Sequence, residues 1–304
     1  MLKYQKVMSE DVYLNVVTEG DINNPAILFI HGFPDSHRTW NRQFEGLSDK
    51  YFVISFDFRG VGESTCSNKK NAYYMTSVVD DVARVLESVL PANRKVHIVG
   101  HDWGSVVGWS FITHPEYKKR VASWTSISGP HIGLFLDWMR RKLVSGKFSD
   151  FKLFASQFTH SWYVMFIQVP GAVDLGIKTI GRLLWRPALR MNGVNGDDEI
   201  FKESSKQVQQ DMLNSVELYR DNLFSPPPLP EKGSIDIPTQ LVIAEKDMFI
   251  LPPMFEYLGE YVNNLTIKHI RGKHWVHRSQ SKTINQYISD FVTLNTEKPL
   301  VEKT

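Results

Sequence analysis

The sequence predicts an α/β fold with a mostly parallel sheet, and two observations carry this prediction. Short, uninterrupted apolar runs recur along the first half of the chain, and helical patterns lie between them. Runs that are apolar throughout are typical of strands buried on both faces, as in parallel sheets covered by helices. Regular alternation of strand and helix is the pattern of α/β proteins.

The expected elements follow in chain order. An alternating pattern predicts a first strand, four apolar runs predict buried strands, and the strand signal resumes in two segments near the end of the chain. Three stretches with apolar residues at helical spacing predict helices between and after them. Strands are expected at 12–18, 26–30, 52–56, 96–99, 121–127, 240–244 and 265–270, and helices at 78–90, 103–114 and about 282–292.

A long helical stretch interrupts this alternation. From about residue 131 to residue 225 the patterns are helical, and a proline-rich segment at 225–230 ends the stretch. Open α/β sheets bind ligands at the C-terminal ends of their strands, so an insertion there would cover the site. We therefore expect an α/β core formed by 1–130 and 231–295, a helical lid at 131–230, and a polar tail at 296–304.

Composition excludes several classes of protein. With 42% hydrophobic and 22% charged residues, the chain is too apolar for a disordered one. A formal charge of +2 gives no nucleic-acid signature, so no nucleic-acid partner is expected. No apolar stretch is long enough to span a membrane, and residues 1–10 lack the apolar segment of a secretory signal. The single cysteine, Cys66, favours a reducing compartment, and we expect a cytoplasmic location.

The strongest chemical motif lies at 99–105, where a buried strand gives way to a helix. The sequence there is Val-Gly-His-Asp-Trp-Gly-Ser, with Gly100 and Gly104 on either side of Asp102. A nucleophile elbow needs such small neighbours, because its central residue sits in a strained turn that lifts the side chain off the sheet. An Asp that caps a helix is an equally good interpretation of this motif alone.

Further motifs at strand ends favour the elbow. The segment 31–34 (His-Gly-Phe-Pro) follows an early strand, where the N–H groups of Phe33 and Trp103 could meet at one oxyanion. Asp247 and His274 follow the last two strands. Each motif alone also fits a turn, a cap or a structural histidine. Together they stand in the chain order nucleophile, acid, histidine, which is the order of hydrolases with this architecture.

With these motifs, the chain resembles α/β-hydrolases of the epoxide hydrolase and haloalkane dehalogenase branch, in which Asp is the nucleophile. The segments 31–34 and 100–104 match the H-G-x-P and elbow motifs of epoxide hydrolases. The segments 162–171 and 218–222 resemble lid segments that carry ring-opening tyrosines, which places Tyr163 and Tyr219 in that role. The resemblance covers about residues 5–295 and implies an α/β-hydrolase fold, a mostly parallel sheet flanked by helices with an inserted helical lid.

The resemblance implies an epoxide hydrolase that makes a vicinal diol through an ester on Asp102. Tyr163 and Tyr219 would protonate the opening ring, because a phenol keeps its proton until an alkoxide develops. Water activated by His274, itself held by Asp247, would then hydrolyse the ester, with the Phe33 and Trp103 N–H groups at the oxyanion. No cofactor and no metal are expected, since clustered Cys/His ligand spacing is absent. The expected substrate is a small apolar epoxide, with lipid-derived epoxides included.

Two alternatives stay open at this point. A haloalkane dehalogenase shares the Asp nucleophile, but it commonly binds halide with Asn or Trp, whereas this chain offers Phe33 and lid tyrosines. Trp103 is compatible with both activities. The non-enzymatic alternative is a ligand-binding or scaffold domain, and the complete set of predicted residues counts against it.

The chain also resembles the N-terminal hydrolase half of bacterial proteins in which such a domain is fused to a short-chain dehydrogenase/reductase. On this resemblance, the chain is expected to be one domain of a longer protein. It has no G-x-G-x-x-G motif, so no dinucleotide site is predicted in it. The sequence leaves the oligomeric state open, with a dimer as one option.

The lid is predicted to be basic. Residues 131–195 hold nine basic and three acidic residues, a formal charge of +6, and are rich in Leu, Phe and Trp. Such a surface can bind anionic lipid, although a solvated face around an apolar core is the more conservative interpretation. Peripheral membrane contact through the lid is therefore a hypothesis. The basic residues are Arg140, Arg141, Lys142, Lys147, Lys152, Lys178, Arg182, Arg186 and Arg190, and the acidic ones are Asp137, Asp150 and Asp174.

Overall fold

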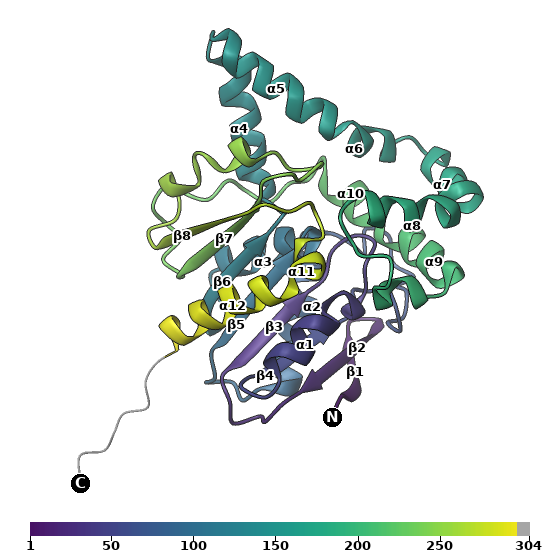
Figure 1. The fold of residues 1–304 in the computed structure, drawn as a ribbon, viewed down its shortest axis with the longest axis vertical. Coiled ribbons are helices and arrows are strands. Elements are labelled where there is room, and N and C mark those ends of the chain that lie inside the picture. Colours follow the sequence, from purple (N-terminus) through teal and green to yellow (C-terminus); the bar gives the residue numbers. More distant parts are fainter. Residues whose placement is uncertain (297–304) are drawn as a thin grey trace.

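An eight-stranded sheet forms the centre of the molecule in the computed structural model, which describes residues 1–296 (Figure 1). Apart from Thr296, the predicted polar tail lies outside the described residues. The strands are β1 (Lys3–Ser9), β2 (Val12–Glu19), β3 (Ala26–Ile30), β4 (Phe52–Phe56), β5 (Val96–His101), β6 (Val121–Ile127), β7 (Thr239–Ala244) and β8 (Leu265–Ile270).

The sheet is mostly parallel, as predicted. Its strand order is β1-β2-β4-β3-β5-β6-β7-β8. β2 pairs antiparallel with β1 and β4, and each pairing from β4 across to β8 is parallel. β3, β4 and β5 are buried along their whole length, because helices cover both faces of the sheet.

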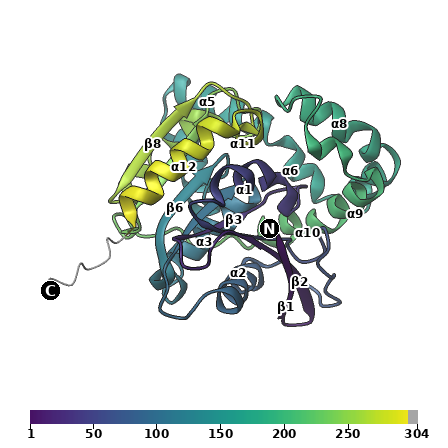
Figure 2. The same ribbon diagram turned by 60° about the horizontal axis from the view of Figure 1, so that its bottom comes forward.

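Two helical layers enclose the sheet. α1 and α12 lie on one face and α2 and α3 on the other (Figure 2). α2 buries the predicted apolar face with Val78, Val82 and Leu86, whereas α3 is buried on nearly all sides. The helices of the core are α1 (Asn41–Leu47), α2 (Met75–Val89), α3 (Trp103–Thr113), α11 (Val276–Ser279) and α12 (Ser281–Asn295), with short turns at His37–Trp40, Tyr117–Arg120, Pro252–Phe255 and Leu258–Glu260.

A run of helices separates β6 from β7 and crosses above the C-terminal ends of the strands (Figure 1). We use the name lid for residues 131–230, and these bounds stay a prediction. In residues 1–296, no helix combines the length and the apolar character that crossing a bilayer takes. The lid helices are α4 (Ile132–Val144), α5 (Phe148–His160), α6 (Trp162–Ile167), α7 (Ala172–Gly176), α8 (Arg182–Met191), α9 (Ser205–Ser215) and α10 (Glu217–Asn222), with short turns at Ile177–Gly181 and Glu199–Lys202.

The glycines of the elbow lie where the helix after β5 touches neighbouring backbone. A Cβ atom on Gly104 would lie 2.0 Å from the carbonyl oxygen of Ile30, and one on Gly100 would lie 2.5 Å from the carbonyl oxygen of Gly104. Backbone atoms inside a sheet cannot move aside as a flexible side chain can. Only glycine therefore fits at these two positions.

We expect Gly104→Ala to destabilise the fold by about 2–3 kcal/mol, because the added methyl group overpacks a site walled by backbone. Urea denaturation would measure the free energy of unfolding. Gly259→Ala is the matched control, since a Cβ atom there meets nothing within 4 Å. Equal stability of the two variants would contradict the packing described for the elbow.

Candidate active site

Asp102 occupies a sharp turn between β5 and α3. Its backbone has φ 53° and ψ −122°, a conformation that residues other than glycine rarely adopt. The turn is held by a hydrogen bond from the Asp102 N–H to the carbonyl oxygen of Ile127 (3.1 Å). The carboxylate accepts a hydrogen bond from the Phe33 N–H, with a distance of 2.7 Å from nitrogen to Oδ1. The motif therefore forms an elbow and not an ordinary helix cap.

The loop that carries Phe33 is fixed by the side chain of His31. Its Nδ1 donates to the carbonyl oxygen of Gly32 (2.9 Å), and its Nε2 accepts from the Phe58 N–H (3.0 Å). Trp103 is the first residue of α3, so its N–H has no acceptor inside the helix. Of the two predicted oxyanion donors, the Phe33 N–H thus binds the carboxylate of Asp102, and the Trp103 N–H is the next backbone donor after Asp102 in the chain.

His274 lies between two carboxylates. Its Nδ1 donates to Asp247, 2.9 Å from Oδ2, and its Nε2 lies 3.4 Å from Oδ2 of Asp102. Burial would lower the pKa of His274, but the two carboxylates outweigh burial and raise it to about 10. In the free protein, His274 is therefore protonated at neutral pH.

Asp247 is held in its charged form. It follows β7, and its Oδ1 accepts hydrogen bonds from the N–H groups of Phe249 (2.8 Å) and Ile250 (3.2 Å). Burial alone would raise the pKa of Asp247, but the charge of His274 and these hydrogen bonds lower it. The carboxylate can therefore both orient the imidazole and stabilise its positive charge.

Two lid tyrosines lie against this site. Tyr163 comes from α6 and Tyr219 from α10, and their ring centroids are 6.0 Å apart. The two phenols share a hydrogen bond, and the Trp103 side chain hydrogen-bonds to Tyr219. Burial, with a contribution from the charge of Asp102, raises the pKa of both phenols well above 10. They therefore hold their protons in the free protein.

The structure brings the seven predicted residues together above the C-terminal ends of the strands. The elbow supplies the carboxylate, the loop after β3 and the first turn of α3 supply the N–H groups, the loops after β7 and β8 supply the acid and the histidine, and the lid supplies the phenols. The roles that we predict for these residues remain predictions, and they are taken up as such below.

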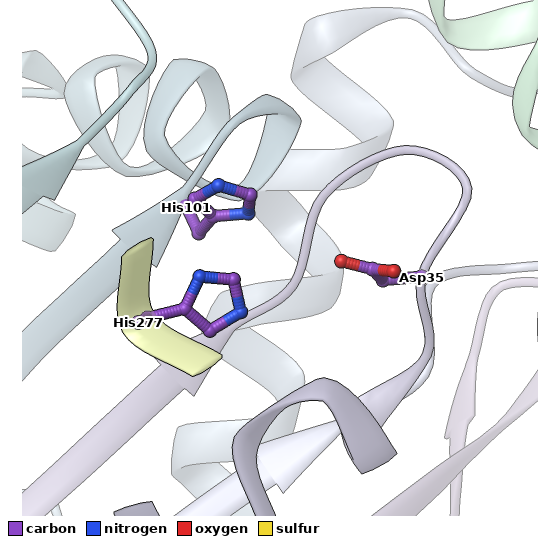
Figure 3. Close-up of side chains that lie close together, drawn as sticks. All are labelled: Asp35, His101 and His277. Atoms are coloured by element: carbon purple, nitrogen blue, oxygen red, sulfur yellow. The ribbon is translucent and has the colours of Figure 1, made fainter. Parts of the chain in front are cut away.

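A second polar cluster, which the sequence did not reveal, lies behind the histidine. Asp35, His101 and His277 are buried, and one potential ligand atom from each lies within 4.8 Å of the others (Figure 3). His101 donates from Nε2 to the carbonyl oxygen of His274 (3.0 Å), and the Thr39 hydroxyl bridges Asp35 and His277. Within residues 1–296, this cluster is the group whose side chains lie close enough to hold a metal ion.

The available sequence signals for this cluster were its positions beside recognised motifs. Asp35 directly follows the 31–34 motif, and His101 precedes Asp102. Burial lowers the pKa of His101 to about 3 and that of His277 well below 6.5, so both rings are neutral. The two rings thus add no charge to the histidine side of the site. Burial raises the pKa of Asp35 to about 6, so at neutral pH its carboxylate is the charged group of the cluster. The cluster joins three segments of the chain.

Residues 25–278 match the model of a protein family described as alpha/beta hydrolase fold. The chain belongs to this family. Among curated relatives of this alpha/beta hydrolase, a "Probable oxidoreductase EphD" of Mycobacterium tuberculosis is 29% identical over 299 residues, which are 94% of this chain and 48% of the relative. Human "Epoxide hydrolase 4" is 25% identical over 311 residues, 97% of this chain and 80% of the relative. The alpha/beta hydrolase thus spans about half the length of the first of these relatives.

Solved structures show the same fold. An epoxide hydrolase of Bacillus megaterium in complex with an inhibitor superposes with a TM-score of 0.76 at 22% identity, over 95% of this chain and 100% of the other. Potato epoxide hydrolase I gives a TM-score of 0.72 at 20% identity, over 97% of this chain and 100% of the other. These matches confirm the predicted α/β-hydrolase fold.

We expect Asp247→Asn to lower the pKa of His274 well below 10, because only the carboxylate of Asp102 then remains to raise the pKa against the lowering effect of burial. Nitrogen-15 NMR of the imidazole would measure it. In the wild type the folded pKa exceeds the ordinary value of 6.5, so the ion pairs stabilise the fold fully below about pH 6.5, and this stability is lost as the pH rises through about 10. The stability gap between wild type and variant should therefore narrow above pH 10. Asp49→Asn, an exposed change, is the control, and an unaltered pKa would contradict the assignment.

Proposed function

We propose that this alpha/beta hydrolase is an epoxide hydrolase that converts an epoxide and water into a vicinal diol through an ester on Asp102. The observation that carries the proposal is the pair of protonated phenols, Tyr163 and Tyr219, beside the elbow carboxylate. A carboxylate nucleophile needs no base to attack, but the alkoxide that leaves needs a proton. Relatives named epoxide hydrolases support the same activity.

In the first step, the carboxylate of Asp102 attacks one epoxide carbon. Its Oδ1 is held by the Phe33 N–H, which leaves Oδ2 as the attacking atom. The C–O bond of that carbon breaks, and the oxygen, still attached to the neighbouring carbon, takes a proton from Tyr163 or Tyr219. The raised pKa of the phenols keeps the proton available until the alkoxide, a much stronger base, develops.

The second step depends on a change of charge. Formation of the ester neutralises Asp102, which is one of the two carboxylates that raise the pKa of His274. The pKa therefore falls, and His274 gives up its proton, which restores the phenol that donated during ring opening. Only then can the neutral imidazole take a proton from water. The hydroxide attacks the ester carbonyl, while the N–H groups of Phe33 and Trp103 stabilise the oxyanion. Cleavage of the ester releases the diol and restores the carboxylate.

Aromatic rings around the carboxylate favour an apolar substrate. The ring of Tyr219 lies 5.4 Å from that of Phe33 and 4.8 Å from that of Trp103, measured between centroids. The ring of Phe249 lies 4.8 Å from that of His274. Such surroundings bind hydrocarbon better than water. We infer that small apolar epoxides, including lipid-derived ones, are the substrate class.

We also infer that the protein works in the cytoplasm and makes peripheral contact with membrane through its lid. Cys66 is free and exposed, which suits a reducing compartment. The formal charge of +6 over residues 131–195 suits contact with anionic lipid.

We expect His274→Gln to accumulate the ester, because ring opening proceeds while hydrolysis lacks its base. Mass spectrometry of the intact protein after incubation with a panel of small epoxides should show an added substrate mass located on Asp102. Asp102→Asn should show none. His269→Gln, at a largely exposed histidine on β8, should turn over epoxide and keep no adduct. Absence of both adduct and diol across the panel would overturn the proposal.

We expect Tyr163→Phe with Tyr219→Phe to slow ring opening about 10²- to 10⁴-fold, the usual contribution of a general acid. Each single variant should lose less, since the other phenol can still donate. Diol formation from the same epoxides would be measured, with Tyr287→Phe on α12 as the control. Release of halide from haloalkanes, with no diol from epoxides, would instead assign the carboxylate to a dehalogenase.

A further inference from the structure

The lid exposes an unusual amount of apolar surface. Of the 27 large hydrophobic side chains that are exposed in residues 1–296, 15 belong to residues 131–191. Soluble surfaces usually scatter such side chains singly, and a contiguous set marks a binding surface. These residues are Leu136, Leu143, Val144, Phe148, Phe151, Phe158, Trp162, Met165, Phe166, Val169, Leu175, Ile180, Leu183, Leu184 and Met191.

Part of this surface forms a stripe along α5 and α6. The rings of Phe151, Phe154 and Phe158 stack in sequence, with centroids 6.2 and 6.1 Å apart. Trp162 and Phe166 continue the stripe on α6, 5.9 Å apart. The spacing of three or four residues keeps these side chains on one side of the helical run. We call Phe148, Phe151, Phe154, Phe158, Trp162, Met165, Phe166 and Val169 the outer lid face.

Other contacts fix which side of α5 and α6 faces the core. Gln157 is buried and binds the loop after β7, where its amide donates to the carbonyl oxygen of Phe249 (2.8 Å) and accepts from the Leu251 N–H (2.9 Å). Ile167 is buried, and Tyr163 packs against the core. In Figure 1, α4 and α5 project beyond the sheet, and α5 and α6 run along the margin of the molecule. The outer lid face therefore points away from the protein.

The exposed charges of residues 131–191 have one sign. The acidic residues of 131–191 are paired and not exposed: Asp137 binds Arg140 and Arg141, Asp150 binds Lys142, and Asp174 binds Arg220. Lys142 is itself buried, so the net charge of the sequence does not describe the surface directly. Among the described side chains of 131–191, the exposed charged ones are Arg140, Lys147, Lys152, Lys178, Arg186 and Arg190, and each is basic.

This charge distribution discriminates between two candidate partners of the outer lid face, a second copy of the chain and an anionic bilayer. A symmetric dimer would pair the face with itself, so Lys147 and Lys152 of each copy would meet a segment that offers no exposed acidic side chain to compensate them. An anionic bilayer accepts both components, because its acyl region takes the aromatic stripe and its headgroups take the lysines. The surface charge therefore favours lipid.

We propose that the outer lid face is a docking surface for an anionic lipid bilayer and that apolar epoxides reach the site from that bilayer. α6 joins the two functions, since Tyr163 faces the elbow while Trp162 and Phe166 face outward. The docking half of the proposal stands on the surface alone. The delivery half rests on the epoxide hydrolase activity proposed above.

Vesicle binding of the untagged full chain tests the docking half. Co-sedimentation would compare vesicles of phosphatidylcholine alone with vesicles that contain 30% phosphatidylglycerol, at low and high salt. We expect at least tenfold tighter binding to the anionic vesicles, and loss of that advantage at high salt. Lys147→Gln with Lys152→Gln should weaken binding about 25-fold, at about fivefold per charge. Phe151→Ser with Phe158→Ser should weaken it at least tenfold.

Matched changes on other surfaces provide the controls. Tyr4→Ser on β1 and Leu294→Ser on α12 remove exposed apolar side chains of similar size and should leave binding unchanged. Brominated lipids should quench the fluorescence of the wild type, and Trp162→Phe should abolish most of that quenching. Absence of sedimentation with anionic vesicles would overturn the proposal. So would self-association, seen by analytical ultracentrifugation, that the Phe151/Phe158 variant abolishes while vesicle binding persists.

Turnover separates failure of docking from failure of the proposed function. An epoxide of a fatty acyl chain, presented in anionic vesicles, should be hydrolysed at least tenfold more slowly by the Phe151/Phe158 variant than by the wild type. A water-soluble epoxide should be hydrolysed equally by both. Vesicle binding without turnover of any epoxide would contradict the proposed epoxide hydrolase activity but would support the docking surface. Equal rates on the vesicle substrate would overturn delivery through the lid.

Discussion

The backbone turn at Asp102 is the constraint on which the rest of the site depends. A φ of 53° is unfavourable for Asp, so it persists only because the surroundings fix it. The hydrogen bond to Ile127 fixes the turn from β6, and the absence of a side chain on Gly32 lets the loop after β3 approach, since a Cβ atom there would lie 2.5 Å from that of Asp102. Once this turn is set, the carboxylate meets the Phe33 N–H and His274 without further adjustment.

The two carboxylates beside His274 differ in what can happen to them. Asp247 is buried and accepts backbone hydrogen bonds, so its charge is permanent under ordinary conditions. Asp102 is the one that reacts under the proposed mechanism, and esterification removes its charge. A single histidine then has a high pKa while the site is free and a lower one while the ester is present. Under this mechanism His274 becomes a base only when the ester has formed, and no change in backbone structure is needed.

The sequence predicted the parts of the site that short loops attach to strands. Asp102 and Asp247 closely follow the buried strands β5 and β7, and His274 follows β8, a partly exposed strand at the sheet edge. The positions of the strands therefore predicted the positions of these side chains. β1 escaped prediction because its residues are mostly exposed and polar, and it is a strand only through its pairing with β2 at the sheet edge. The contact between Asp35 and His277 escaped because it joins residues far apart in the chain. The surface charge of the lid could not be predicted from a count of charged residues, because the count does not show which of them form ion pairs or are buried.

The lid and the catalytic acid depend on the same short loop. The N–H groups of Phe249 and Ile250 hold Asp247, and the neighbouring carbonyl of Phe249 and N–H of Leu251 hold Gln157 of α5. Because α6 continues from α5, this loop also sets the rotation that turns Tyr163 inward. Successive residues of a helix are about 100° apart, so a rotation by one position would move the phenol away from the elbow and bring an outer aromatic side chain toward it. Gln157, buried between α5 and the core, and the hydrogen bond from Gln168 to the carbonyl oxygen of Tyr219 together keep the chemistry on one side of the lid and the apolar surface on the other.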